Sequence, residues 1–160
     1  MSIRRILVAV LTAFLSAAII SAAAQTVSDS GYRTVAHITS DGTIQDSSYM
    51  TIGHIRSDGT VLDASYRTVG HIRSDGTVQD ESYRTMGHIR EDGTVQDASY
   101  RTIGHVREDG TIQDDSYRTI GHAKGIPRKW AAFYFFFRKY HLWKHVNLWH
   151  PVTEGWHMRS

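Results

Sequence analysis

Six histidines recur along this chain at a constant spacing of 17 residues: His37, His54, His71, His88, His105 and His122. Imidazoles bind transition metals and change charge in the physiological pH range, so a closed ring of them could do either. Zinc, however, needs three or four ligands within about 2.1 Å of one point, whereas equivalent residues of neighbouring hairpins lie about 10 Å apart. We therefore expect the histidines on an outer, polar face, with an inward-facing ring as the alternative, and we assign no metal site.

Other residues that could do chemistry are isolated or identical in every copy. His141 and His145 have the i, i+4 spacing of a metal pair on an expected helix, but no third ligand is in view. Asp75 and Asp80 flank one strand without forming an acidic calcium loop, and we expect them to accept hydrogen bonds from backbone amides in turns. Ser, His and Asp recur in every copy, which provides no single asymmetric catalytic site. We expect neither enzyme activity nor a cofactor.

The period that spaces the histidines belongs to a whole repeated unit. Tyrosine recurs in step at Tyr32, Tyr49, Tyr66, Tyr83, Tyr100 and Tyr117. An Asp-Gly pair occurs in five of these units, whereas the sixth Tyr-to-His segment, "YRTIGHA", lacks one. Since unpaired strand edges are avoided by closure, we expect this surplus segment to complete a ring by pairing with the first unit.

Each unit is predicted to be a β-hairpin. Thr, Val, Ile and Tyr dominate it, and Asp-Gly between two such runs is a strong hairpin signal. A three-residue Ser-Asp-Gly loop, with Gly76 in the left-handed region, would pair Ile72 with Val78 and provide one apolar face. Val69 lies three residues before Ile72, so a bulge or bend at Gly70 is needed to bring both to that face. Five bent hairpins predict a curled sheet that closes into a shallow five-fold barrel.

The end of the chain is aromatic and basic. All four tryptophans lie in the last 38 residues, and Pro127 suits the first turn of a helix extending to about Val146. The run from Trp130 to Phe137 is apolar on all sides, as in an enclosed helix. We expect it to fill the centre of the barrel through six aromatic residues: Trp130, Phe133, Tyr134, Phe135, Phe136 and Phe137. The alternative is contact with an anionic lipid surface through Arg138, Lys139, Trp143 and Lys144.

Units such as "IGHIRSDGTVQD" and "IGHVREDGTIQD", together with the tail "AKGIPRKWAAFYFFF", resemble the five-fold β-flower proteins of bacteria over residues 30–137. The resemblance implies a shallow closed β-barrel with hairpin petals. It also implies some similarity to tubby-like barrels, in which a hydrophobic helix occupies the centre. It carries over no active site.

The first residues read as a secretory signal peptide. Arg4 and Arg5 precede an apolar run, and Ala22 and Ala24 supply the small residues of a cleavage site before Gln25. The chain has no cysteine, so neither disulfides nor a lipoprotein anchor is available. We expect export and a periplasmic or extracellular location, with outer-membrane association left open.

The remaining chain divides into a hairpin domain at 25–122, an aromatic helix at 123–146 and a tail at 147–160. Nine basic and fifteen acidic residues occupy 25–122, whereas seven basic residues and one acidic residue occupy 123–160. The basic block is short, which argues against a nucleic-acid partner. The sequence predicts a non-enzymatic structural or binding module of the cell envelope, and the alternative is a protein that binds a lipid surface through its tail.

Overall fold

The structure is a computed structural model that describes residues 24–138. Its strands form one closed antiparallel barrel in which each strand pairs with its two neighbours, in the order β1-β12-β11-β10-β9-β8-β7-β6-β5-β4-β3-β2. The strands are β1 (Gln25–Asp29), β2 (Thr34–Ile38), β3 (Thr43–Asp46), β4 (Thr51–Ile55), β5 (Thr60–Asp63), β6 (Thr68–Ile72), β7 (Thr77–Asp80), β8 (Thr85–Ile89), β9 (Thr94–Asp97), β10 (Thr102–Val106), β11 (Thr111–Asp114) and β12 (Thr119–His122). The expected closed barrel of hairpins is confirmed.

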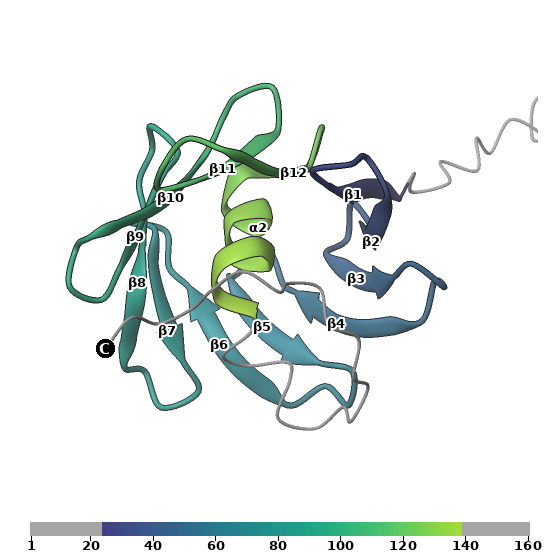
Figure 1. Ribbon diagram of the computed structural model, residues 1–160. Coiled ribbons are helices and arrows are strands. Elements are labelled where there is room, and N and C mark those ends of the chain that lie inside the picture. Colours follow the sequence, from purple (N-terminus) through teal and green to yellow (C-terminus); the bar gives the residue numbers. More distant parts are fainter. Residues whose placement is uncertain (1–23, 139–160) are drawn as a thin grey trace, which may run out of the picture.

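Strands β1 and β12 close the barrel. Five hairpins carry the Asp-Gly turns, and β12 with β1 forms a sixth one, through the pairs Ser28–His122 and Asp29–Gly121. The ring therefore contains six hairpins, five with Asp-Gly turns and one assembled from the first and last strands (Figure 1). The expected partner of the surplus strand was the first unit, and the structure shows that this partner is β1, whose sequence Thr26-Val27-Ser28-Asp29 corresponds to Thr77-Val78-Gln79-Asp80.

The Asp-Gly turns have the predicted three-residue form. Ile72 pairs with Val78, the Arg73 N–H donates to the Thr77 carbonyl at 2.9 Å, and the Gly76 N–H donates to the Arg73 carbonyl at 3.0 Å. Gly76 has a φ of +87°, in the left-handed region. A side chain here would also be blocked, because a Cβ on Gly76 would lie 2.0 Å from the carbonyl oxygen of Ile89 in the next hairpin.

The loops between hairpins repeat this geometry with tyrosine in place of glycine. The Asp80 N–H donates to the Arg84 carbonyl and the Tyr83 N–H donates to the Asp80 carbonyl, both at 3.0 Å. The tyrosine adopts a φ of +62°, and the five equivalent tyrosines lie between +60° and +62°. A bulky side chain in this region costs about 1–2 kcal/mol relative to the right-handed conformation, so other contacts must hold each tyrosine there.

A β-bulge bends each strand that follows a tyrosine loop. Gln79 pairs with Thr85 and Val78 pairs with Gly87, which leaves Met86 as an extra residue on β8. Val69 holds the same position on β6, and both residues pack against the core. The bend that we expected beside Gly70 is confirmed.

The bulge gives each hairpin one apolar face and one polar face. Ile72 and Val78 are buried in the core, whereas His71 and Gln79, which alternate with them, face outward. The buried aliphatic residues on the inner face of all six hairpins form a single cluster, to which Leu62, at the outward position of Gln79, does not belong.

A short helix occupies the middle of the ring (Figure 1). It comprises α2 (Arg128–Ala132) followed by a π-helical turn, η1 (Phe133–Phe137). Pro127 precedes the first helical residue, and η1 packs into the core cluster of the barrel. The expected central aromatic helix is confirmed, and the part of it expected after residue 138 lies outside the described residues.

Two sets of contacts orient this helix along the barrel. At its start, Arg128 and Lys129 donate hydrogen bonds to the carbonyls of Glu91 and Ser74, which lie in Asp-Gly turns. Further along, the Tyr134 hydroxyl lies 3.5 Å from the carbonyl of Val35, beside a tyrosine loop. The helix therefore enters at the Asp-Gly end and leads toward the tyrosine end.

Candidate functional site

The six histidines lie on the outer face, each stacked against the tyrosine of its own hairpin. In five pairs the two residues are twelve positions apart, and their ring centroids are 4.2–4.5 Å apart with interplanar angles of 11–18°. The sixth pair, Tyr32 with His122, joins the tyrosine loop between β1 and β2 to the last strand, β12. Its ring centroids are 4.2 Å apart and its interplanar angle is 10°. Each tyrosine thus folds back over the polar surface, and the stacking helps to hold its left-handed backbone.

This arrangement spreads the histidines around the barrel instead of bringing them together. Within residues 24–138, no group of three or more His, Cys, Asp or Glu side chains converges on a point where a metal ion could bind. The alternative of an inward-facing histidine ring is wrong, because the inner face is occupied by the aliphatic side chains of the same strands.

The repeated aspartates that end the second strand of each hairpin organise the tyrosine loops. Asp80 is 3% exposed; its Oδ1 accepts the N–H groups of Ser82 and Arg84 at 2.8 and 2.9 Å, and its Oδ2 accepts Nε of Arg84 at 2.8 Å. Burial raises the pKa of Asp80, but the hydrogen bonds from Arg84 and Ser82 outweigh it, so the pKa lies below its ordinary value. Asp114 makes the same three contacts with Ser116 and Arg118.

The aspartates of the Asp-Gly turns are more exposed. Asp92 accepts the Thr94 N–H at 2.9 Å, and the hydrogen bonds from Thr94, first from its backbone and then from its side chain, hold the pKa of Asp92 below its ordinary value. Asp75 and Asp109 make the equivalent contact with Thr77 and Thr111. These carboxylates are therefore ionised at neutral pH and retain acceptor capacity.

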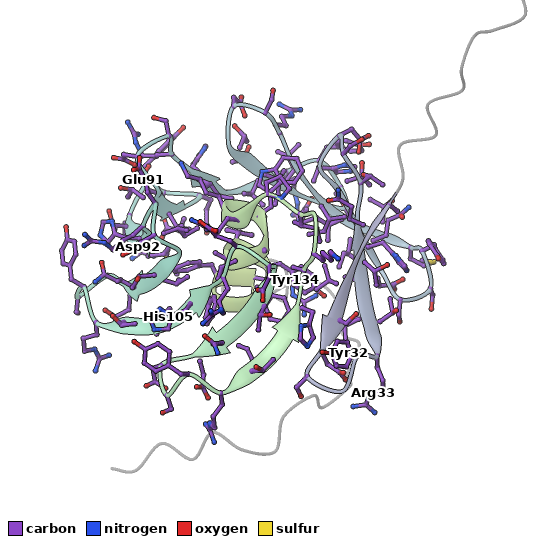
Figure 2. The ribbon with its side chains drawn as sticks, turned by 90° about the horizontal axis from the view of Figure 1, so that it is seen from above. Tyr32, Arg33, Glu91, Asp92, His105 and Tyr134 are labelled. Atoms are coloured by element: carbon purple, nitrogen blue, oxygen red, sulfur yellow. The ribbon has the colours of Figure 1, made fainter. Side chains whose placement is uncertain are left out.

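An open groove lies between two neighbouring hairpins. It has a volume of about 480 Å³. Its lining includes Asp92 from the β8–β9 turn, His105 from β10, Gln113 from β11 and Tyr117 from the following loop, together with Arg107, Glu108 and Asp109 from the β10–β11 turn. Figure 2 shows Asp92 and His105 on the same flank of the barrel. The groove combines an aromatic ring with three carboxylates, a guanidinium, an imidazole and an amide.

The six aromatic residues predicted for the plug lie on the central helix and differ in burial. Phe133, Tyr134 and Phe137 are 0%, 5% and 1% exposed, whereas Trp130, Phe135 and Phe136 are partly buried against the same cluster. Figure 2 places Tyr134 beside the helix, toward the centre of the ring. Burial raises the pKa of the Tyr134 hydroxyl.

The residues predicted for lipid contact are only partly described. The Arg138 guanidinium lies 4.2 Å from the centre of the Tyr134 ring, and its Nη1 donates to the Tyr134 hydroxyl at 2.9 Å. Lys139, Trp143 and Lys144 lie outside the described residues, as do His141, His145 and the residues up to position 23, where we expect a signal peptide. Among the residues that the structure places, no helix has the length and apolar character needed to span a bilayer.

The six repeated tyrosines lie on the surface, and their spacing in the sequence does not predict their structural role. All six are 62–75% exposed, which is unusual for large aromatic side chains. Their regular period was visible in the sequence, but their left-handed backbone and their stacking partners were not.

Comparison with known proteins identifies a family and no individual relative. A family model described as a 5-fold beta-flower protein matches residues 23–139. No curated protein and no solved structure matches the chain.

Proposed function

The chain belongs to the five-fold β-flower family, and on that premise we propose that it is a non-enzymatic, exported binding module of the bacterial cell envelope. The observation that supports this most directly is the distribution of polar side chains. The core is filled by aliphatic and phenylalanine side chains, whereas His, Gln, Asp and Tyr recur on the outside of successive hairpins. Repeated identical surface groups suit binding to a repetitive surface better than catalysis at one asymmetric centre.

Export is supported by where the barrel begins. Strand β1 starts at Gln25, the residue that follows the expected cleavage site after Ala24. Cleavage there would remove the leader and leave all twelve strands of the barrel intact.

Expression of the full chain with its own leader tests this proposal. We expect the protein in the periplasmic, outer-membrane or extracellular fraction, with Gln25 as its first residue by mass spectrometry. In the matched variant Ala24→Phe, the bulky side chain should block the peptidase, so that a longer chain accumulates at the inner membrane. Recovery of an uncleaved wild-type chain in the cytoplasm would overturn the export part of the proposal. Binding is tested by co-sedimentation with isolated cell envelopes, and absence of binding would overturn the rest.

A lipid surface is the second candidate, and the orientation of the helix favours it. The helix leads toward the end of the barrel that carries the exposed tyrosines, and Arg138 lies at its last described position. Tyrosine and arginine are frequent at membrane–water interfaces. Co-sedimentation with vesicles of phosphatidylglycerol and phosphatidylethanolamine tests this, with the charge-reversed chain Lys139→Glu/Lys144→Glu as the comparison. Equal, negligible binding of both chains would exclude the lipid surface.

A further inference from the structure

We propose that the grooves between neighbouring hairpins each bind a pyranose ring, so that the barrel holds one glycan chain, or several, at repeated sites. This inference rests on the proposed binding function and specifies its ligand class. It is argued from the groove that contains Asp92 and Tyr117, and from the recurrence of the same residues elsewhere in the ring.

The aromatic ring of Tyr117 forms one wall of this groove. It is 66% exposed, although one of its faces is covered by the His105 imidazole, at a centroid distance of 4.5 Å and an interplanar angle of 11°. The opposite face is therefore available to a ligand. Carbohydrates present apolar C–H faces, and a rigid aromatic ring offers them contact area at a low cost in conformational entropy.

The tyrosine ring is also held in position before a ligand arrives. Its backbone is fixed at a φ of +61°, Nε2 of Gln113 donates to the Tyr117 carbonyl at 3.0 Å, and the tyrosine N–H donates to the Asp114 carbonyl at 3.1 Å. A preorganised aromatic ring loses little conformational entropy when a ligand binds. This helps polar ligands that make only weak contacts with the protein. Strained backbone conformations occur most often at functional sites, so a binding role for the exposed tyrosine ring would explain its positive φ.

Polar groups for sugar hydroxyls surround the ring. The Asp92 carboxylate is exposed and can accept hydrogen bonds beyond those that it receives from Thr94. Arg107 is exposed and can donate several. A groove that places an acceptor and a donor beside an aromatic face can orient a hydroxylated ring, because few well-placed polar groups are needed for specificity.

The same set of residues recurs twice more at 17-residue steps. Asp75, His88, Arg90, Gln96 and Tyr100 form one copy, and Asp58, His71, Arg73, Gln79 and Tyr83 form the other. The stacking and the Gln-to-Tyr hydrogen bond are present in both copies, with Nε2 to carbonyl distances of 3.1 and 3.0 Å. Leu62 and Ser28 replace the glutamine at two of the remaining positions of the ring, and Thr39 replaces the arginine at the third, so three of the six positions carry the full set of residues.

Three similar sites on one rigid barrel suit a polymer made of similar units. Binding of a second sugar residue from the same chain becomes intramolecular, which can strengthen overall binding by about 10²–10⁴-fold without any new contact. A phospholipid headgroup or a folded protein would not offer a repeating series of C–H faces.

The test uses the full chain and three soluble probes: chitotetraose, cellotetraose and maltotetraose. We expect titration calorimetry to detect binding of at least one of them at more than one site per chain. The matching solid polymer (chitin, cellulose or amylose resin) should retain the protein about 100-fold more strongly than the tetrasaccharide does. If none of the three probes binds, and none of the three polymers retains the chain, the inference is wrong.

Two triple variants separate the tyrosine rings from the fold. In Tyr83→Gly/Tyr100→Gly/Tyr117→Gly, glycine accepts the left-handed backbone and only the rings are lost. In Tyr83→Phe/Tyr100→Phe/Tyr117→Phe, the rings remain. We expect the glycine variant to lose at least 10-fold in polymer retention, and the phenylalanine variant to stay within about 3-fold of the wild type. Circular dichroism of both checks that the barrel is folded.

The outcomes also distinguish this inference from the proposed function. If the glycine variant binds isolated envelopes as well as the wild type does and no sugar probe binds, the chain remains an envelope-binding protein and the glycan grooves are rejected. If neither chain binds envelopes or sugars, both proposals fail. If the glycine variant loses affinity only for phospholipid vesicles, the tyrosines contact lipid and the glycan proposal is overturned.

Discussion

A Cβ atom on Gly104 would lie 2.3 Å from Cζ of Phe136, so the ring of the central helix touches the barrel wall where the wall has no side chain. The neighbouring residues repeat this relationship. A Cβ on Gly121 would meet the ring of Phe135 at 2.4 Å, and one on Gly87 would meet that of Phe137 at 2.8 Å. Three successive phenylalanines thus cover the strand glycines of three successive hairpins, in reverse order. The glycines that bend the strands also make room for the helix.

Replacement of Gly104 by alanine should therefore destabilise the protein. The new methyl group would clash with Phe136 and also with the Gln113 carbonyl, 2.5 Å away, which belongs to the backbone and can yield little. Overpacking of this kind costs about 1–3 kcal/mol. Urea denaturation followed by tryptophan fluorescence measures the change in the free energy of unfolding.

The control for this substitution is Gly31→Ala. Gly31 is exposed, and a Cβ there would contact only the Asp29 carboxylate, at 3.3 Å. We expect its free energy of unfolding to stay within about 0.5 kcal/mol of the wild type. Equal stability of the Gly104→Ala variant and the wild type would show that the helix does not press against the wall.

The two kinds of loop should differ in how much stability they lose when the residue with a positive φ is replaced. Gly76→Ala introduces a Cβ 2.0 Å from the Ile89 carbonyl, at a φ of +87°, so we expect a loss of several kcal/mol. Tyr83→Gly relieves about 1–2 kcal/mol of backbone strain and removes a ring contact worth about 0.5–1.5 kcal/mol, so its net effect should be small. Thermal unfolding by circular dichroism compares the two variants.

Tyr83→Ala shows which of these terms dominates. Alanine keeps the backbone strain but loses the stacking with His71, so this variant should unfold at a lower temperature than Tyr83→Gly. The reverse order would mean that the left-handed tyrosine conformation is not strained in this loop.

The aspartates of the tyrosine loops should make the barrel sensitive to acid. The pKa of Asp80 lies below its ordinary value because the hydrogen bonds from Arg84 and Ser82 outweigh the opposing effect of burial, and the same holds for Asp63, Asp97 and Asp114 with their own partners. A carboxyl with a lowered folded-state pKa contributes stability that is complete above its unfolded pKa and is lost as the pH falls through the folded value. The melting temperature should therefore be nearly constant from pH 7 to about pH 5 and should fall below about pH 4.

Asn is the informative replacement in this loop. Asp80→Asn can still accept the backbone N–H groups of Ser82 and Arg84 but cannot ionise, so the variant should be less stable at pH 7 and should lose less stability on acidification. An unchanged dependence of the melting temperature on pH in this variant would contradict a role for Asp80 in acid sensitivity.

Several elements could be predicted because their signals are local. The Asp-Gly turns, the apolar pair Ile72 and Val78, and the bend at Gly70 follow from turn chemistry and from alternation along a strand. Strand β1 was missed because Ser28 replaces the repeated glutamine and no tyrosine or glycine turn precedes it. Sequence patterns thus located the five Asp-Gly hairpins and the closing strand β12, but not β1, with which β12 pairs.

The contacts between hairpins and helix were beyond sequence reasoning for a different reason. A tyrosine with a positive φ is uncommon, so its conformation is visible only once the stacked histidine is placed beside it. The matching of Phe135, Phe136 and Phe137 to three glycines depends on the π-helical turn, which no residue propensity predicts. The candidate groove likewise combines residues from two hairpins, Asp92 from one and Tyr117 from the other.

Removal of the Phe133 ring should show how much the central helix contributes to the barrel. Phe133 is fully buried, with its ring 6.5 Å from that of Phe137, so Phe133→Ala should leave a cavity and cost about 3–5 kcal/mol. Tyr134→Phe is the comparison on the same helical turn, because it removes only the hydroxyl, whose bond to the Val35 carbonyl is long at 3.5 Å, together with the bond from Arg138. Urea denaturation should show a large loss for the first variant and about 1 kcal/mol or less for the second. If Phe133→Ala unfolds at the same urea concentration as the wild type, the hairpins hold the barrel closed without the helix, and its aromatic side chains must be retained for another reason.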